Sequence, residues 1–254
     1  MKKSLSQEGL FLPAMNDKNT LPTEARPIAI PGTHEAFLGF FLMRENPSAR
    51  VLDLGAGQGA LTLKLLQAGF SVEACDYFPE NFRLEGITCQ KADITTQLPY
   101  ESQSFDIVVA VEVTEHVTDH TRFFSEVFRI LKPGGRFYAT TPNILSVKSR
   151  FRFLSAGFFY SFQPLDAGRR DGLQHVASLT ADQYDYLGQL AGFTPVEIHT
   201  DKEQKSSRWL YYLLFPVWKL APLARKTRYR HNQRILLLGR LLFLVYTKPV
   251  YPGK

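Results

Sequence analysis

The chain has 254 residues, of which 44% are hydrophobic and 21% charged; this excludes disordered, collagen-like and low-complexity classes and favours one elaborated domain. Its two cysteines, Cys75 and Cys89, are too few for a disulfide framework, so we expect a reduced, cytoplasmic setting. The net charge is +6, and it is distributed unevenly along the chain.

Residues 1–33 contain four prolines among polar residues, which is typical of a loosely ordered lead. Residues 34–254 are then expected to form one domain. A helix is predicted over residues 33–45, and short β-rich runs follow at residues 50–54, 71–76, 105–111, 135–141 and 193–199. Helical patterns between several of these runs predict a parallel sheet covered on both faces, with the nearly continuous apolar run at 105–111 as a central strand.

The strongest local signal is Val-Leu-Asp-Leu-Gly-Ala-Gly-Gln-Gly at residues 51–59, where a strand enters a glycine-rich turn before a helix. Gly55 permits the tight turn, and Gly57, next to Ala56, lets the backbone approach a ligand. The carboxylate of Asp53 would repel a pyrophosphate but attract an ammonium and a sulfonium group. This favours S-adenosyl-L-methionine over a nicotinamide cofactor; an incidental aspartate before an ordinary turn is the alternative.

Acidic residues also follow the next two strands. Asp76 lies 23 residues after Asp53, where it can accept hydrogen bonds from both ribose hydroxyls. Tyr77 can lie against adenine, Asp93 can accept from the adenine amino group, and Ile94 can pack on the ring. Each residue alone has a structural explanation, because acids often end strands and a tyrosine there usually packs. Their order and spacing favour the joint interpretation.

These segments together resemble the class I S-adenosylmethionine-dependent methyltransferases. The resemblance rests on residues 51–61, Asp76, Asp93, residues 105–117 and Leu-Lys-Pro-Gly-Gly-Arg-Phe at residues 131–137. It implies a Rossmann-like α/β fold whose seven-stranded, mostly parallel sheet has helices on both faces and an antiparallel last strand. It also implies that S-adenosyl-L-methionine lies across the carboxyl ends of strands one, two and four.

The last strand is expected at residues 239–249, which leaves two inserts in the domain. Residues 143–178 are rich in aromatic residues and arginines without regular periodicity, so they are expected to form an irregular lid over the acceptor. Within them, Arg152 and Tyr160 are expected to shape the acceptor pocket. Residues 204–238 form a basic, apolar, helical insert before the last strand, which departs from the family pattern.

The sequence Glu-x-x-Glu-His at residues 112–116 supplies the candidate catalytic groups. Displacement at a sulfonium needs mainly positioning and desolvation, but a hydroxyl acceptor must also lose a proton. Glu112, Glu115 and His116 are three and four positions apart, so a helical turn would bring them together. His116 has the intrinsic pKa best suited to a general base near neutrality. Glu112 is also expected to contact the cofactor.

The same motif resembles the metal site of small-RNA 2′-O-methyltransferases and ubiquinone-pathway O-methyltransferases. Two carboxylates and an imidazole suit magnesium, manganese or zinc, and His175 can add a ligand. Because many relatives share the Glu-His pair without a known metal, we assign no metal from the sequence. The structural alternative for Glu115 and His116 is a solvent-facing helix start. His34 can approach the cofactor's carboxylate, or it is a surface histidine at a helix start.

The positive charge is concentrated at the end of the chain. Residues 204–254 contain eleven Lys or Arg and no acidic residue, whereas 19 basic and 24 acidic residues precede them. The uncharged run at residues 209–218 is too short to span a bilayer and is followed by a basic cluster at residues 225–230. Apolar surface beside cations suits an interfacial helix, so residues 204–238 are predicted to contact an anionic membrane surface. Packing on the core or on a second subunit is the alternative.

The leading functional hypothesis is a methyltransferase that modifies an apolar or lipid-linked small molecule, at oxygen, in the cytoplasm or at the inner face of the membrane. Examples of such acceptors are a quinone precursor and a polyprenyl-linked sugar. An RNA methyltransferase would use the basic tail on phosphates, but the body is acidic and contains no recognised RNA-reading module. The third hypothesis is a cofactor-binding, non-catalytic partner of another protein. The oligomeric state is left open.

Overall fold

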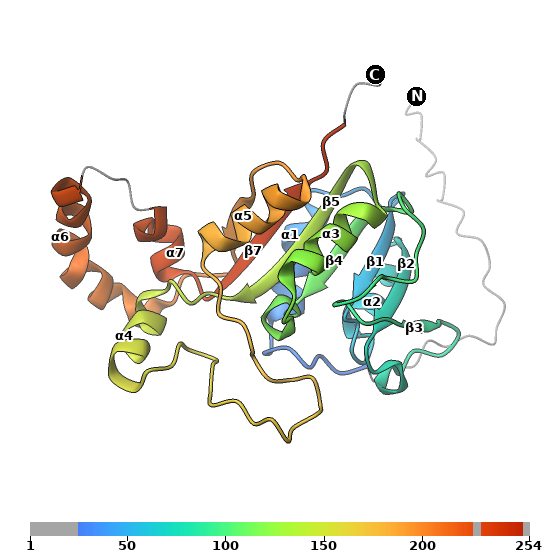
Figure 1. Ribbon diagram of the computed structural model, residues 1–254, viewed down its shortest axis with the longest axis horizontal. Helices are drawn as coiled ribbons and strands as arrows, with labels where there is room; N and C mark the ends of the chain where they lie inside the picture. The colour runs from blue at the N-terminus through green and yellow to red at the C-terminus, as the bar shows by residue number, and fades with distance from the viewer. Residues whose placement is uncertain (1–24, 226–229, 251–254) are drawn as a thin grey trace, which may run out of the picture.

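The computed structural model describes residues 25–225 and 230–250. Within them, one seven-stranded sheet has the order β3-β2-β1-β4-β5-β7-β6 (Figure 1). The strands are β1 (Arg50–Leu54), β2 (Ser71–Asp76), β3 (Cys89–Lys91), β4 (Phe105–Val111), β5 (Leu131–Pro142), β6 (Glu197–Thr200) and β7 (Leu241–Thr247). β7 pairs antiparallel with both β5 and β6, whereas the other pairs are parallel. The predicted fold class, with its antiparallel last strand, is confirmed.

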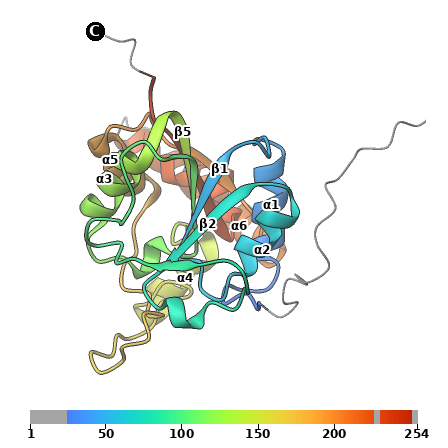
Figure 2. The ribbon, with the colours of Figure 1, turned by 90° about the vertical axis from the view of Figure 1, so that its right-hand side faces the viewer.

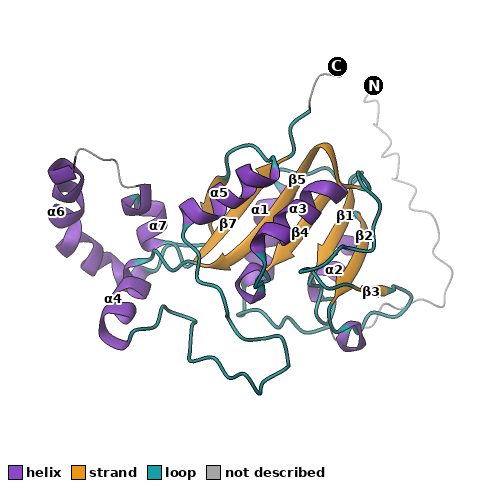
Figure 3. Cartoon of the chain, viewed as in Figure 1, coloured by secondary structure: helices purple, strands orange, loops and turns teal. Residues whose placement is uncertain are grey.

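Helices cover both faces of this sheet. Figure 2 shows α3 (His120–Ile130) and α5 (Ala181–Ala191) on one side and α1 (Thr33–Leu42) and α2 (Ala60–Gln67) on the other. Three further helices, α4 (Val147–Ala156), α6 (Arg208–Arg225) and α7 (Arg234–Leu238), lie together beyond one end of the sheet (Figure 3). Short 3-10 turns occur at Pro79–Asn81, Thr114–His116, Lys205–Ser207 and Arg230–Asn232. The three-layer body therefore carries a separate group of helices at its edge.

The core forms because apolar residues recur with the period of each element. In α3, Phe123, Val127 and Ile130 are fully buried at helical spacing, and the helix begins where the Asp119 carboxylate accepts a hydrogen bond from the Arg122 amide at 2.9 Å. Five of the seven residues of β4 are fully or almost fully buried hydrophobics, Phe105 and Ile107 to Ala110, as expected of a central strand covered on both faces.

The structure differs from the sequence-based expectations in the lid and at the start of β6. The irregular lid contains a helix, α4, which begins where the Ser146 hydroxyl accepts from the Ser149 amide. Its apolar residues Phe151 and Leu154 are exposed, so they do not follow a core-facing period that sequence inspection would detect. β6 begins at Glu197 rather than at residue 193, because the chain turns through Gly192 with φ 107° and buries Phe193 in the core instead.

The end of the lead lies against the glycine-rich loop. The backbone amide of Arg26 donates to the Gln58 side-chain oxygen at 3.2 Å, and a Cβ at Gly57 would lie 3.1 Å from Ile28 Cδ1. Most of the predicted lead, residues 1–24, falls outside the described residues.

None of the helices within residues 25–225 and 230–250 has both the length and the hydropathy needed to cross a bilayer.

Candidate functional site

The glycine-rich loop joins β1 to α2 and faces the end of β2. Gly55 and Gly57 have φ angles of 80° and 55°, which other residues rarely adopt. A Cβ at Gly55 would lie 2.5 Å from Val113 Cγ2, so this position also needs a glycine for space. The amides of Gly55 and Ala56 donate to the Cys75 carbonyl at 2.9 and 3.1 Å. The loop is therefore held tightly at the carboxyl ends of β1 and β2, where a ligand can approach its backbone.

Two of the predicted carboxylates lie on either side of this loop. Asp53 is buried and accepts a hydrogen bond from the Thr62 hydroxyl at 2.6 Å. Burial raises the pKa of Asp53 to about 7, although the Thr62 bond opposes the shift. Asp76 accepts from the backbone amides of Gly57 and Phe78, each at 2.8 Å. Because a carboxylate has about four lone-pair sites, Asp76 still has capacity to accept from a ligand.

The three other predicted cofactor contacts follow β2 and β3. Tyr77 is exposed, and the Lys91 ammonium lies 6.0 Å from its ring centroid. The Oδ1 atom of Asp93 accepts from the Thr95 amide and hydroxyl at 2.8 and 2.6 Å, which fixes this side chain at the start of a turn. Ile94 packs partly against the main core cluster. The predicted residues thus follow neighbouring strands that end at the same edge of the sheet.

Glu112 has an unusual backbone. Its φ angle is 57°, a strained value for a glutamate. Its amide donates to the Thr140 hydroxyl, which in turn donates to a Glu112 carboxylate oxygen at 2.9 Å. Burial raises the pKa of Glu112 to about 7, and the nearby Arg240 opposes this rise. Strained residues of this kind gather at ligand sites, so Glu112 makes the end of β4 a candidate ligand site.

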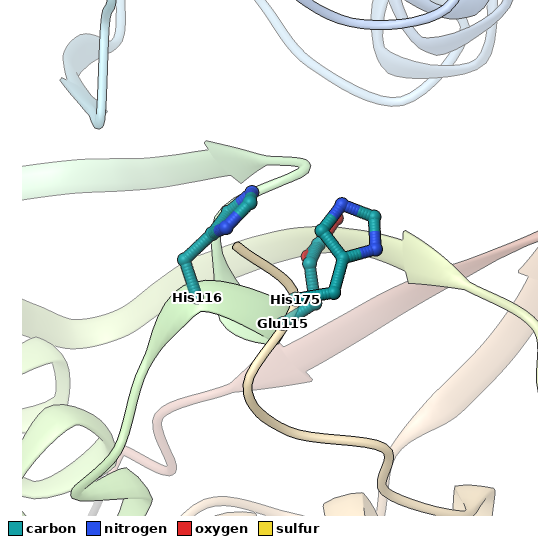
Figure 4. A group of neighbouring side chains, drawn as sticks. All are labelled: Glu115, His116 and His175. Atoms are coloured by element: carbon teal, nitrogen blue, oxygen red, sulfur yellow. The ribbon is translucent and has the colours of Figure 1, made fainter. Parts of the chain in front are cut away.

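The structure brings Glu115 and His116 together with His175 of the lid. Their potential ligand atoms all lie within 4.8 Å of one another, whereas Glu112 is not part of this group. Figure 4 shows the three side chains projecting from the turn after β4 and from the lid into one shared space. The expectation that Glu112, Glu115 and His116 would all converge is therefore wrong for Glu112. The residues after it form a 3-10 turn, Thr114–His116, rather than an α-helical turn, and His175 of the lid joins Glu115 and His116 instead.

Glu115 is fully buried, and neither of its carboxylate oxygens has a hydrogen-bond partner. Burial, and then the negative charge of Glu112, raise the pKa of Glu115 well above its usual range. This excludes the solvent-facing helix start that was the structural alternative for Glu115. A buried polar group without partners costs stability, which is an indication of a ligand-binding role.

The two histidines of this cluster have different environments. The Nδ1 atom of His116 lies 2.9 Å from the Gln174 carbonyl oxygen, which can only accept, so Nδ1 carries the proton and Nε2 of the neutral ring has a free lone pair. Burial lowers the pKa of His116 below its usual value. Burial and the nearby His116 lower the pKa of His175 to about 4, and its Nδ1 has no partner. Both rings are therefore neutral near pH 7.

These groups fit a divalent cation. One carboxylate with two unpaired oxygens and two neutral imidazoles form a donor set that zinc, manganese or magnesium accepts. The Gln174 carbonyl that orients His116 is the kind of outer hydrogen-bond partner found behind metal-bound histidines.

Several supporting residues have no sequence signal that would have revealed them. Thr62 holds Asp53, Thr140 holds Glu112, and the Tyr184 hydroxyl lies 3.2 Å from that of Thr114 behind the Glu115 turn. They come from helices and strands distant in the chain, so only the fold brings them to the site. Their spacing in the sequence follows no motif.

The remaining predicted residues lie on α1 and on the lid. His34 is buried at the start of α1, and its Nδ1 has no partner, which excludes the surface histidine that was the alternative. Beside it, Glu35 pairs with Lys64 of α2 at 3.1 Å. Tyr160 is exposed on the lid, where the Lys148 ammonium and the Arg152 guanidinium lie 4.1 and 5.6 Å from its ring centroid. The lid therefore presents cations and aromatic rings beside the cluster.

Comparison with known proteins identifies relatives of this chain. Residues 29–198 match the protein family described as "Methyltransferase domain". The chain is 28% identical over 160 residues to the ubiquinone biosynthesis O-methyltransferase of Psychrobacter arcticus, covering 59% of this chain and 60% of that protein. It is 33% identical over 116 residues to the sterol 24-C-methyltransferase of Clavispora lusitaniae, covering 41% of this chain and 30% of that protein. The matched region is thus less than two thirds of the length of either relative.

A solved structure shares the fold. The crystal structure of a SAM dependent methyltransferase from Archaeoglobus fulgidus superposes with a TM-score of 0.60 at 16% identity, covering 84% of this chain and 92% of the other.

Proposed function

Because this chain belongs to the methyltransferase domain family and uses S-adenosyl-L-methionine as its cofactor, we propose that it transfers the methyl group to an oxygen of an apolar or lipid-linked small molecule. The observation that carries this proposal is the cluster that the buried Glu115 forms with His116 and His175 at the end of β4. Relatives named as ubiquinone biosynthesis and sterol methyltransferases support an apolar acceptor.

The cofactor-binding residues have distinct roles in this proposal. Asp53 neutralises the ammonium group of the cofactor near the Gly55–Gly57 turn, and Asp76 accepts from the ribose hydroxyls. Tyr77 and Ile94 enclose the adenine, and Asp93 accepts from its amino group. Glu112 lies at the end of β4, where its carboxylate contacts the cofactor, and His34 faces the cofactor's carboxylate from α1.

His116 is the proposed general base. In the reaction, the acceptor oxygen attacks the methyl carbon, the bond from that carbon to sulfur breaks, and S-adenosylhomocysteine leaves. The hydroxyl proton of the acceptor goes to Nε2 of His116, whose lone pair is free because Nδ1 donates to the Gln174 carbonyl. The fully buried Glu115 lies beside this imidazole, where it orients the acceptor hydroxyl.

The same three side chains would hold a divalent ion if one binds. Glu115, His116 and His175 would be its ligands, and its positive charge would lower the pKa of an acceptor hydroxyl.

An acceptor of this class is dissolved in a bilayer, so the proposal includes contact of residues 204–238 with an anionic membrane surface and a cytoplasmic location at the inner face. The basic cluster at residues 225–230 that contributed to this prediction has its side chains outside the described part. Tyr160 and Arg152 of the lid shape the pocket for the acceptor in this proposal.

Incubation with methyl-labelled cofactor and fractionated cell extract tests the proposed acceptor class. We expect label in the organic-extractable fraction. Label in RNA would support the RNA methyltransferase alternative and contradict our proposal. Binding of the cofactor without transfer to any fraction would favour the non-catalytic alternative.

A further inference from the structure

An unusual amount of large apolar surface is exposed on the helices beyond the end of the sheet. On α6, Trp209, Leu213, Val217 and Leu220 are each more than half exposed. They are three or four positions apart, so they share one face of the helix. The opposite face packs inward: Tyr211 is buried, and the Trp218 ring lies 5.5 Å from it. The exposed face is therefore not the side by which α6 attaches to the protein.

The neighbouring helix α4 extends this surface. Val147 of α4 shares a buried cluster with Tyr211 of α6 and with Leu237 and Leu238 of α7, and Figures 1 and 3 show the three helices grouped at one end of the molecule. Leu154 of α4 is 84% exposed. Because α4 and α6 are packed together, their exposed residues can meet the same external surface.

The charge of this region selects an anionic partner. Residues 143–165 and 204–254 contain no acidic residue. Lys148 and Arg152 of α4 lie over the ring of Tyr160, and the Lys219 ammonium of α6 lies 5.4 Å from the ring of Phe215. Cations beside aromatic and aliphatic side chains match a surface with anionic headgroups above an apolar layer.

A row of aromatic rings leads from this surface to the site. Phe153 of α4 stacks on Phe159 with ring centroids 4.5 Å apart, and Phe159 contacts the buried Phe162 at 6.4 Å. Phe162 lies 5.3 Å from His175, which lies 4.9 Å from His116. The lid segment thus connects the exposed helix α4 to the proposed catalytic cluster through continuous ring contacts.

We propose that α4 and the exposed face of α6 together form a membrane-docking arm for an anionic phospholipid bilayer, from which the acceptor reaches Glu115 and His116 along the aromatic row. This inference rests on the proposed function, because only an apolar or lipid-linked acceptor needs such a route. The inference adds α4 to the membrane contact predicted for residues 204–238. It also connects the membrane-docking arm to the Glu115–His116 cluster through the aromatic row.

The exposed aliphatic residues and the positive charge of this surface favour a bilayer over RNA or a second copy of the chain. RNA stacks on aromatic rings, but Leu154, Leu213, Val217 and Leu220 have no π-face to offer a base. A second copy of the chain would bring two cationic surfaces together, which opposes self-association.

The two tryptophans of the chain, Trp209 and Trp218, provide an internal pair of probes because both lie on α6. With Trp218→Phe, the remaining Trp209 is 67% exposed on the proposed docking face. We expect phosphatidylglycerol vesicles at low salt to shift its emission to the blue and brominated acyl chains to quench it. With Trp209→Phe, the remaining Trp218 packs against Tyr211 and should be quenched much less. Absence of quenching of Trp209 would overturn the proposal.

Variants on both helices test whether they act as one arm. We expect Leu154→Glu on α4 and Leu213→Glu on α6 each to weaken vesicle binding about tenfold or more, because each places a negative charge in the apolar part of the bilayer. Leu190→Glu on α5 is the matched control, because Leu190 is 57% exposed but lies on a different helix. Equal loss in the control, or no loss from the α4 variant, would contradict the two-helix arm.

Four further measurements separate the outcomes. Cofactor affinity by calorimetry should stay unchanged in all these variants, which shows that the fold is intact. Concentration-dependent dimers that protect Trp209, or tighter binding of a single-stranded RNA oligonucleotide than of vesicles, would overturn membrane docking in favour of those occupants. Vesicle binding without methyl transfer to any apolar fraction would instead overturn the proposed function and leave the docking surface standing.

Discussion

The Asp76 carboxylate accepts a hydrogen bond from the backbone amide of Gly57 at 2.8 Å, which ties the end of β2 to the glycine-rich loop after β1. One side chain thus organises the loop for which we propose contact with the cofactor, and it also lies where the ribose hydroxyls are expected. Loss of this carboxylate should weaken cofactor binding in two ways, because both the hydrogen bond to the loop and those expected to the ribose would be lost.

Asp76→Ala should therefore weaken S-adenosyl-L-methionine binding by about ten- to a hundredfold, the range expected for lost hydrogen bonds to a charged group. Isothermal titration calorimetry measures this directly. Glu73→Ala is the control, because Glu73 lies on the same strand but pairs with Arg50 away from the loop. Unchanged affinity in Asp76→Ala would contradict the ribose role.

Asp53 should make cofactor binding dependent on pH. In the free protein, burial raises its pKa to about 7, so the carboxyl group is largely protonated at pH 6. The cofactor's ammonium group favours the ionised form, so binding at pH 6 should release a proton. Affinity should rise by about tenfold per pH unit below 7 and level off above it. Calorimetry in buffers of different ionisation enthalpy measures the released proton, and a heat independent of buffer would argue against this role.

The raised pKa of Asp53 also makes the stability of the cofactor-free protein depend on pH. Because the folded state holds the Asp53 proton more tightly than the unfolded chain, whose pKa is near 3.8, stability without cofactor falls as the pH rises between these values. Asp53→Asn should remove this loss, so its gain in Tm over the wild type should be larger at pH 8 than at pH 4. A gain that is the same at both values would show that Asp53 is not held protonated.

The Glu115 carboxyl group is expected to lower the stability of the folded protein and to be needed for methyl transfer. Glu115→Gln replaces a fully buried carboxyl group whose oxygens have no partners with a neutral group of similar size. We expect the variant to keep or raise Tm at pH 8 without added metal, while methyl transfer falls by at least about tenfold. Thermal unfolding and labelled transfer are the two measurements. A variant that retains full activity would remove Glu115 from the proposed site.

Divalent ions should stabilise the folded protein through the same cluster. We expect magnesium, manganese or zinc to raise the Tm of the wild type and to have a much smaller effect on His175→Ala, because binding to the folded state alone adds to its stability. His199→Ala is a useful control, because His199 lies on β6 beside Arg44, away from the cluster. If none of the three ions shifts Tm, the cluster does not hold a metal and direct proton transfer to His116 remains its role.

Local motifs were predictable from the sequence because their residues are close along the chain. The turn from β1 through Gly55 into α2 and the acidic residue Asp76 at the end of β2 follow from short-range spacing and the alternation of strands and helices. The positive φ of Glu112 did not follow, because nothing in its sequence distinguishes a strained turn from a helical one. The approach of His175 to His116, about 60 residues earlier in the chain, depends on the path of the lid, residues 143–178, whose sequence has no periodic pattern.

The proposed role of His116 is tested most directly by a single turnover of methyl transfer from labelled S-adenosyl-L-methionine to the organic-extractable fraction of a cell extract, with wild-type protein and His116→Ala. We expect the wild type to label an apolar product at oxygen, and His116→Ala to transfer at least about a hundredfold more slowly while binding the cofactor with unchanged affinity. Equal transfer rates for the two proteins, or label from the wild type that enters only RNA or protein, would contradict it.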